Sequence, residues 1–165
     1  MTHTVGTLTD FSLDENIDGL TNDSAKPLGT MDNNTAEYST ARIALVFDLD
    51  TTAANLDVDG VIELYFICSL DDTTWTDGID PDTTSDIKGS IKHASLIKAF
   101  RADKSMAGLD ISWVCPDLSL MVDSQGNKIG ELPNYWSLVV WNRSGSSIQN
   151  TANNIAKYQT VTYGT

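Results

Sequence analysis

The chain has 165 residues, of which 41% are hydrophobic, and this is enough apolar material for the core of one domain. Its formal net charge is −13, from 10 Lys and Arg against 23 Asp and Glu. So large an acidic excess argues against nucleic acid, whose phosphates need clustered Lys and Arg, and against docking on anionic membranes. Its simplest consequence is a soluble, self-repelling surface; adaptation to salty surroundings and a basic partner are the sharper alternatives.

Residues 1–37 are polar, rich in Asp and Asn, and only weakly periodic. They predict an extended arm with one short strand near residues 5–8, which either wraps its own domain or reaches a neighbour. The first residues carry neither a basic start nor an apolar core, so we expect no secretion signal. No apolar run approaches the length of a membrane span. Residues 38–165 are expected to form the folded domain.

The next two apolar segments alternate with a period of two, which is typical of strands with one dry face. They cover residues 38–49 and 61–70. Their spacing fits an antiparallel hairpin or a short crossover. The side chains that we expect to be buried share one parity within each strand, together with two from a later strand: Ile43, Leu45, Phe47, Ile62, Leu64, Phe66, Leu138 and Val140.

A long acidic loop follows at residues 71–89, with Trp75 near its middle. Loops of this length are usually functional or disordered. Three chemistries fit its composition: a calcium site, a pair of glycosidase carboxylates whose candidates include Glu63 of the preceding strand, and a sugar-stacking surface on Trp75. The carboxylates concerned are Asp71, Asp72, Asp77, Asp80 and Asp82. Asp is so common here that pairs arise by chance, and solvated turns are the expected outcome.

The remaining segments also favour strands. Residues 91–102 fit a helix or a strand, and the all-β surroundings favour a strand. Short strands are expected at 109–114 and 118–122, and longer ones at 135–142 and 156–163. About eight short strands with regular turns predict an all-β protein, an antiparallel β-sandwich or jelly roll.

Few residues are suited to catalysis. The only histidines are His3 and His93, and the only cysteines, Cys68 and Cys115, lie in apolar strand-like runs. Buried free thiols are expected, with a disulfide as the alternative. A Cys–His93 dyad would lack a third, orienting group, so we expect no enzyme and assign no catalytic, cofactor-binding or metal-binding residue.

Three tryptophans, Trp113, Trp136 and Trp141, lie in predicted strands. Trp136 and Trp141 have opposite parity, so one of them should face outward. An outward Trp on a sheet more often marks a protein interface than a ligand site.

Two segments carry a resemblance to a known family. The strand predicted at 61–70 runs into the segment SLDDTTWTDG, residues 69–78, and residues 132–145 read LPNYWSLVVWNRSG. In order and separation they are similar to elements of small virion proteins of tailed phages, the jelly-roll capsid decoration (cement) proteins. Trp75 stands where Tyr is more usual, Asn134 where a second Pro is common, and the N-terminal arm has no counterpart.

The resemblance implies a non-enzymatic protein that is made in the host cytoplasm and sits on the outer surface of the capsid. It implies a homotrimer that binds the major capsid protein and bridges capsomers, and no catalytic residue comes with it. The alternative is a carbohydrate-binding β-sandwich module of a tail or adhesin protein, with Trp75 as the stacking residue. A small sandwich hydrolase ranks last.

Overall fold

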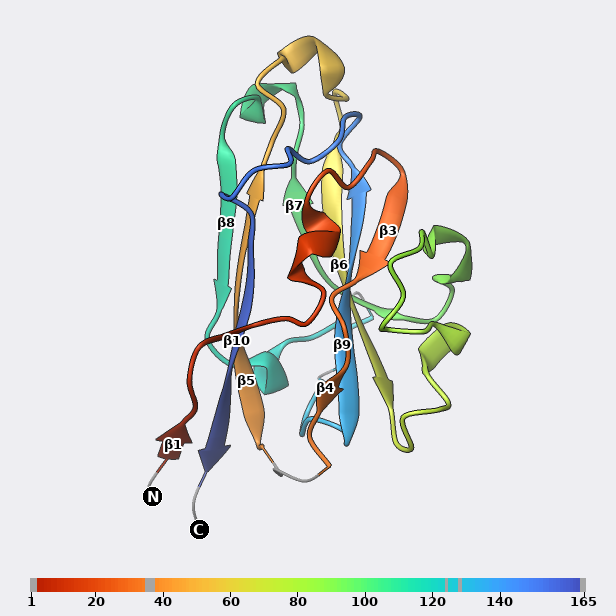
Figure 1. Ribbon diagram of the computed structural model, residues 1–165, viewed down its shortest axis with the longest axis vertical. Coiled ribbons are helices and arrows are strands. Elements are labelled where there is room, and N and C mark those ends of the chain that lie inside the picture. Colours follow the sequence, from red (N-terminus) through yellow and green to blue (C-terminus); the bar gives the residue numbers. More distant parts are fainter. Residues whose placement is uncertain (1–2, 35–37, 124, 128, 164–165) are drawn as a thin grey trace.

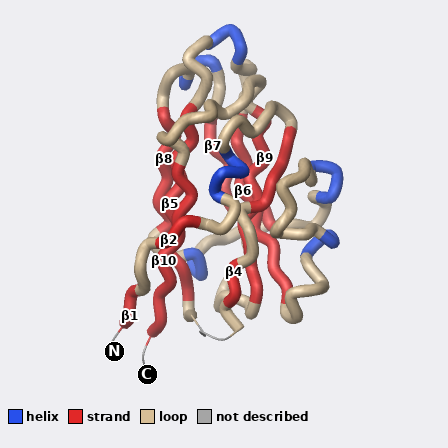
Figure 2. The backbone as a smooth tube through the Cα atoms, in the orientation of Figure 1, coloured by secondary structure: helices blue, strands red, loops and turns tan. Residues whose placement is uncertain are grey.

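Two antiparallel sheets face each other in the computed structural model, which describes residues 3–34, 38–123, 125–127 and 129–163 (Figures 1 and 2). Sheet A contains β1 (His3–Val5), β2 (Thr9–Asp10), β5 (Thr40–Asp48), β8 (Asp110–Cys115) and β10 (Ile155–Tyr163). Sheet B contains β3 (Ser24–Pro27), β4 (Met31–Asp32), β6 (Val61–Ser69), β7 (Ser95–Arg101) and β9 (Tyr135–Arg143). The helical turns of the described residues are all of the 3₁₀ type: η1 (Asp14–Ile17), η2 (Ala53–Asn55), η3 (Thr76–Gly78), η4 (Lys88–Ser90), η5 (Lys104–Met106) and η6 (Leu118–Leu120).

The ten strands occupy eight strand positions in the two sheets, called lanes below. β1 and β2 both pair with β10, and β3 and β4 both pair with β9, so each of these pairs of short strands fills one lane. Numbered along the chain, the lanes run 1-8-3-6 in sheet A and 2-7-4-5 in sheet B. This is the winding order of a jelly roll, so the expected fold class is confirmed. β5 and β6 lie in different sheets, and their connection is a crossover.

The core lies between the two sheets and includes the side chains that the sequence predicted to be buried. All eight side chains expected to be buried are at most 8% exposed. The Trp136 ring, 2% exposed, stacks beside Phe66 with centroids 6.2 Å apart and an interplanar angle of 19°. Each such side chain contributes about 1.5–3 kcal/mol when it is removed from water. Trp141, of opposite parity, lies on the outer face of sheet B.

The N-terminal segment differs from the expected arm. Its described residues supply four strands, β1 to β4, to both sheets (Figure 1). Phe11, Ile17, Leu20 and Leu28 are at most 1% exposed and belong to the core. The expected single strand near residues 5–8 is therefore wrong. Strands of two to four residues, separated by turns, are too short to show a period of two, and only their pairing with β9 and β10 defines them.

Two further expectations had opposite outcomes. The ambiguous segment 91–102 contains strand β7, as favoured. The strand expected at 118–122 is wrong, because η6 occupies most of it. The Asp117 carboxylate accepts hydrogen bonds from the Ser119 N–H and hydroxyl, at 3.0 and 2.6 Å. Such a cap stabilises a helical turn locally and competes with an extended conformation.

Candidate functional site

The two segments that carry the resemblance lie side by side in sheet B. β6 and β9 pair antiparallel along their length, so that Ser69, at the end of the first strand, faces Tyr135, at the start of the second. Beyond the strands, the Asn134 side-chain amide donates to the Leu70 carbonyl oxygen at 3.2 Å. The outward-facing side chains of β6 and β9 therefore share one surface, the outer face of sheet B, and the loops that adjoin these strands meet at its end.

An aromatic and charged cluster occupies this outer face. The Tyr65 and Trp141 rings lie with centroids 6.2 Å apart, and the Arg143 guanidinium lies 5.3 Å from the centroid of the Trp141 ring. Glu63 joins the two sides: its Oε1 accepts from Arg143 at 3.3 Å, and its Oε2 accepts from the Tyr65 hydroxyl at 2.9 Å. Burial, and then the bond to Glu63, raise the pKa of Tyr65 to about 12. Tyr65 is therefore neutral at physiological pH, and the cluster is suited to recognition rather than proton transfer.

The alternation of Glu63 and Tyr65 with apolar residues, and the opposite parity of the two strand tryptophans, indicated the aromatic half of this cluster. Sequence reasoning missed Arg143. Its ion pair with Glu63 depends on the register of β6 against β9, which places Val61 opposite Arg143 and Glu63 opposite Trp141.

Trp75 is not the exposed stacking residue that the sequence suggested. It is 8% exposed and packs with Ile67, Ile79 and Val139 in a second apolar cluster. This cluster lies on the outer face of sheet B, beneath the long acidic loop. Ile67 and Val139 leave an apolar patch there, and folding the loop and its Trp over the patch removes apolar area from water.

Asp71 and Asp77 of the acidic loop accept several hydrogen bonds from backbone N–H groups. Asp71 Oδ1 accepts from the N–H groups of Thr73 and Thr74 at 3.0 and 2.8 Å, and these bonds lower the pKa of Asp71. Asp77 Oδ2 accepts from three consecutive N–H groups, those of residues 92–94, at 2.7–2.8 Å. Burial by itself would raise the pKa of Asp77, but the three donors outweigh burial and lower it. A glycosidase acid needs a raised pKa, so neither group resembles one.

The other carboxylates considered as calcium ligands, Asp72, Asp80 and Asp82, are in different surroundings and do not share a binding partner. Asp82 accepts from the Thr30 N–H and hydroxyl, both at 2.9 Å, which ties the loop to the segment before β4. Asp80 accepts from the Asp82 N–H at 3.0 Å, and Asp72 is exposed. Among the described residues, no three His, Cys, Asp or Glu side chains converge as a metal site requires. The calcium hypothesis gains no support from this geometry.

The cysteines are free thiols, as expected: Cys115 is buried in sheet A and Cys68 is half-buried in sheet B. Burial raises the pKa of Cys115, which is the opposite of the shift that activates a nucleophilic thiol. His93 is exposed in the segment between η4 and β7, and its backbone N–H donates to Asp77. The side chain of His3 lies outside the described residues.

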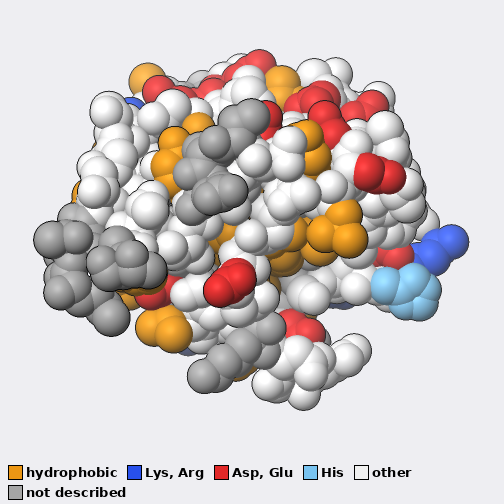
Figure 3. Space-filling model, turned by 90° about the horizontal axis from the view of Figure 1, so that it is seen from below, with side chains coloured by type: hydrophobic (Ala, Val, Ile, Leu, Met, Phe, Trp, Pro, Cys, Tyr) orange, Lys and Arg blue, Asp and Glu red, His pale blue; other side chains and the backbone are white. Residues whose placement is uncertain are grey.

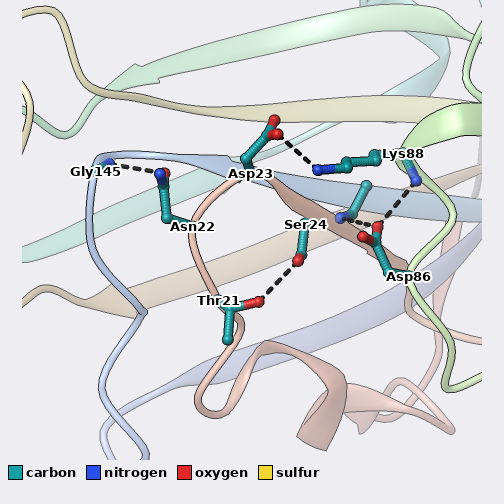
Figure 4. Close-up of polar contacts among 8 residues, drawn as sticks. Thr21, Asn22, Asp23, Ser24, Asp86, Lys88 and Gly145 are labelled. Carbon is teal, nitrogen blue, oxygen red and sulfur yellow. Dashed lines mark hydrogen bonds and ion pairs between the residues drawn. The ribbon is translucent and has the colours of Figure 1, made fainter.

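A polar hollow of about 590 Å³ borders the aromatic and charged cluster, lined by Asn22, Asp23, Asp57, Val58, Asp59, Val61 and Arg143. Its rim is held by contacts between distant loops (Figure 4). Asn22 Oδ1 accepts from the Gly145 N–H at 2.8 Å, and Lys88 Nζ lies 2.6 Å from Asp23 Oδ2. Asp86 Oδ1 accepts from the N–H groups of Ala25 and Lys88. Val58, 69% exposed, projects from this ordered rim.

Comparisons with known protein families, with curated proteins and with solved structures found no match to this chain. Within the part of the chain that the structure describes, no helix has the length and apolar character needed to cross a membrane.

Proposed function

We propose that this chain is a non-enzymatic virion structural protein, a capsid decoration (cement) protein that stabilises the head of a tailed phage. The observation that carries the proposal is the pairing of β6 with β9, which joins the two resembling segments into one surface. The jelly-roll winding supports it, because this architecture is common among viral capsid domains. The partner is the major capsid protein, and the site of action is the outer surface of the capsid.

The proposed homotrimer now depends on a different face from the one that the sequence indicated. The outward Trp141 is half-buried beneath Arg143 and beside the acidic loop, so it does not demand a neighbour. On the outer face of sheet A, Val114 of edge strand β8 is 68% exposed and lies beside Ala44 of β5. An apolar side chain on an open sheet edge favours association with another chain.

The experiment that tests the function is reconstitution on capsids. Purified protein is added to heads assembled from the major capsid protein alone, and bound and free protein are separated on a density gradient. We expect saturable binding at a fixed ratio to the capsid subunit, and a higher temperature of head disruption. Absence of the protein from purified virions, together with no binding to the heads, contradicts the proposal.

The alternative, a carbohydrate-binding module on a tail or adhesin, has lost the residue that supported it, because Trp75 is buried. Jelly rolls also occur among lectin domains. The alternative therefore needs a different aromatic surface from the one around the acidic loop.

A further inference from the structure

Two neighbouring hollows lie toward the end of the sandwich that carries both termini, away from the polar hollow described above. The first, of about 400 Å³, opens between the sheets and is lined by side chains of β4, β9 and β10 and by residues 6–9. The second, of about 350 Å³, is lined by residues 33–34, 38–39 and 131–134. Tyr38 lines both. In the view of this end, apolar side chains are visible at the centre of the face, among polar ones (Figure 3).

The first hollow, which we name the threonine hollow, has an aromatic wall and a hydroxyl rim. The half-buried Tyr158 ring forms the wall and packs against the buried Trp136, with ring centroids 6.3 Å apart at 87°. Phe11 holds Tyr158 from behind, with centroids 5.1 Å apart. Thr7, Thr9, Thr30 and Thr160 contribute the rim. At Gly6 a Cβ would lie 2.5 Å from Thr160 Oγ1, so only glycine lets the chain pass close to that hydroxyl.

The second hollow, the asparagine hollow, is lined by amide and carboxylate groups: Asn33, Asn34, Asn134 and Glu131, with Ser39. Asn33 is 6% exposed and holds the backbone of Tyr38 at both groups. Its Oδ1 accepts from the Tyr38 N–H at 2.6 Å, and its Nδ2 donates to the Tyr38 carbonyl at 3.1 Å. The backbone of Tyr38 is therefore held between the two hollows before any ligand arrives, which lowers the entropic cost of ordering this segment on binding.

The residues that line the two hollows are suited to binding a hydroxyl-rich ligand with flat apolar faces. Rings of Tyr38 and Tyr158 offer apolar contact, and the hydroxyls of Thr7 and Thr160 and the side-chain amide of Asn34 can both donate and accept hydrogen bonds. The Asn33 amide and the Thr30 hydroxyl are already engaged, by Tyr38 and Leu132 and by Asp82 respectively. Both volumes fall in the range of ligand pockets, about 300–1,000 Å³. Among the residues that the structure describes, the charged groups that line the two hollows are Asp32 and Glu131, and none is Lys or Arg. Anionic ligands would be repelled.

We infer that the two hollows form one saccharide-binding groove, with Tyr38 between two subsites, for a neutral or amino-bearing oligosaccharide. The groove is distinct from the surface around Trp75 and Trp141. The inference goes beyond the proposed function and does not rest on it, because the residues that line the groove, and not a capsid, would recognise the ligand.

The test begins with a printed glycan array that carries neutral, amino-bearing and acidic glycans. The strongest neutral or amino-bearing oligosaccharide is then titrated calorimetrically, and into protein carrying ¹³C-labelled tyrosine rings. We expect saturable binding and ring-signal shifts at Tyr38 and Tyr158, with Tyr65 and Tyr163 unshifted. Tyr38→Ala should weaken binding about tenfold, while Tyr163→Ala, an exposed tyrosine toward the same end that lines neither hollow, should not.

Three results overturn the groove: no binding anywhere on the array, binding confined to acidic glycans, and binding that survives Tyr38→Ala unchanged. Circular dichroism and thermal unfolding of Tyr38→Ala show whether its fold is intact. Should that variant unfold, Thr160→Val and Asn34→Ala, one in each hollow, replace it with the same expectations. Capsid binding by Tyr38→Ala is measured alongside, so that loss of the groove and failure of the decoration function are distinguishable.

Discussion

Asp77 fastens the acidic loop to the sandwich, and its replacement gives the sharpest test of the structure. Its Oδ2 accepts from the N–H groups of Lys92, His93 and Ala94 at 2.8, 2.7 and 2.8 Å. The bond to Ala94 is partly buried, and the other two are exposed. The loop's own Trp75 and Ile79 are buried against Ile67 and Val139 of sheet B. Releasing this carboxylate should therefore loosen the cover over the outer face of sheet B.

The magnitude follows from the three donors. A hydrogen bond to a charged group contributes about 1.5–3 kcal/mol to folding. Exposed N–H groups bind water once the carboxylate is gone, so mainly the Ala94 bond counts, and Asp77→Ala should cost about 2–3 kcal/mol from lost hydrogen bonds. Asp77 also has φ +60°, where alanine is strained by about 1 kcal/mol more.

Asp72 provides a matched control, because its φ is +59° and it lies in the same loop. Its carboxylate makes no hydrogen bond to any described residue. Asp72→Ala carries the same backbone strain, so the difference between the two variants isolates the Asp77 hydrogen bonds. Asp77→Asn retains a side chain that tolerates positive φ and keeps one acceptor oxygen. Because hydrogen bonds to a carboxylate are about twice as strong as those to an amide, this variant should lose about half of the unfolding free energy that the carboxylate bonds contribute.

Urea unfolding at pH 7, followed by tryptophan fluorescence and by far-ultraviolet circular dichroism, measures these differences. The pKa of Asp77 is lowered by folding, so its contribution is present above the unfolded value of 3.8. That contribution is lost as pH falls through the folded value. The gap between the native protein and Asp77→Asn should therefore close in acid. Equal unfolding free energies for Asp77→Ala and Asp72→Ala at pH 7 would refute the reasoning.

Other expectations concern the N-terminal segment, the sheet A face and the thiols. Deletion of residues 1–37 should abolish cooperative unfolding, since it removes β1–β4 and the buried Phe11 and Leu28; a deletion variant with an unchanged melting temperature contradicts this. Val114→Asp should leave the fold intact but prevent the trimer, which salt should otherwise favour by screening the charge of −13 per chain; sedimentation across a salt series checks it, and a trimer that survives the substitution rules this face out. With a thiol reagent under native conditions, Cys68 should react before the buried Cys115, whose pKa is raised; simultaneous modification of both would show that Cys115 is not protected.

The sequence by itself determined the fold class and the part of the core that the long strands supply. The alternation of apolar and polar residues in segments such as 61–70 predicts a strand, because a period of two places one set of side chains on one face of a strand. The same rule assigned opposite faces to Trp136 and Trp141. In a long strand, the pattern of apolar and polar residues by itself predicts which side chains are buried.

Tertiary structure decided the rest. Strands of two to four residues, such as β2 and β4, contain too few residues to show a period and exist only because β10 and β9 offer a partner. The sequence around Trp75 predicts an exposed loop residue, but in the folded protein Trp75 covers an apolar patch on the outer face of sheet B. Tyr38 and Trp136 are 98 positions apart in the sequence, yet both line the threonine hollow. Burial of a loop and assembly of a site are properties of pairs of segments, and no single segment carries them in its own residue order.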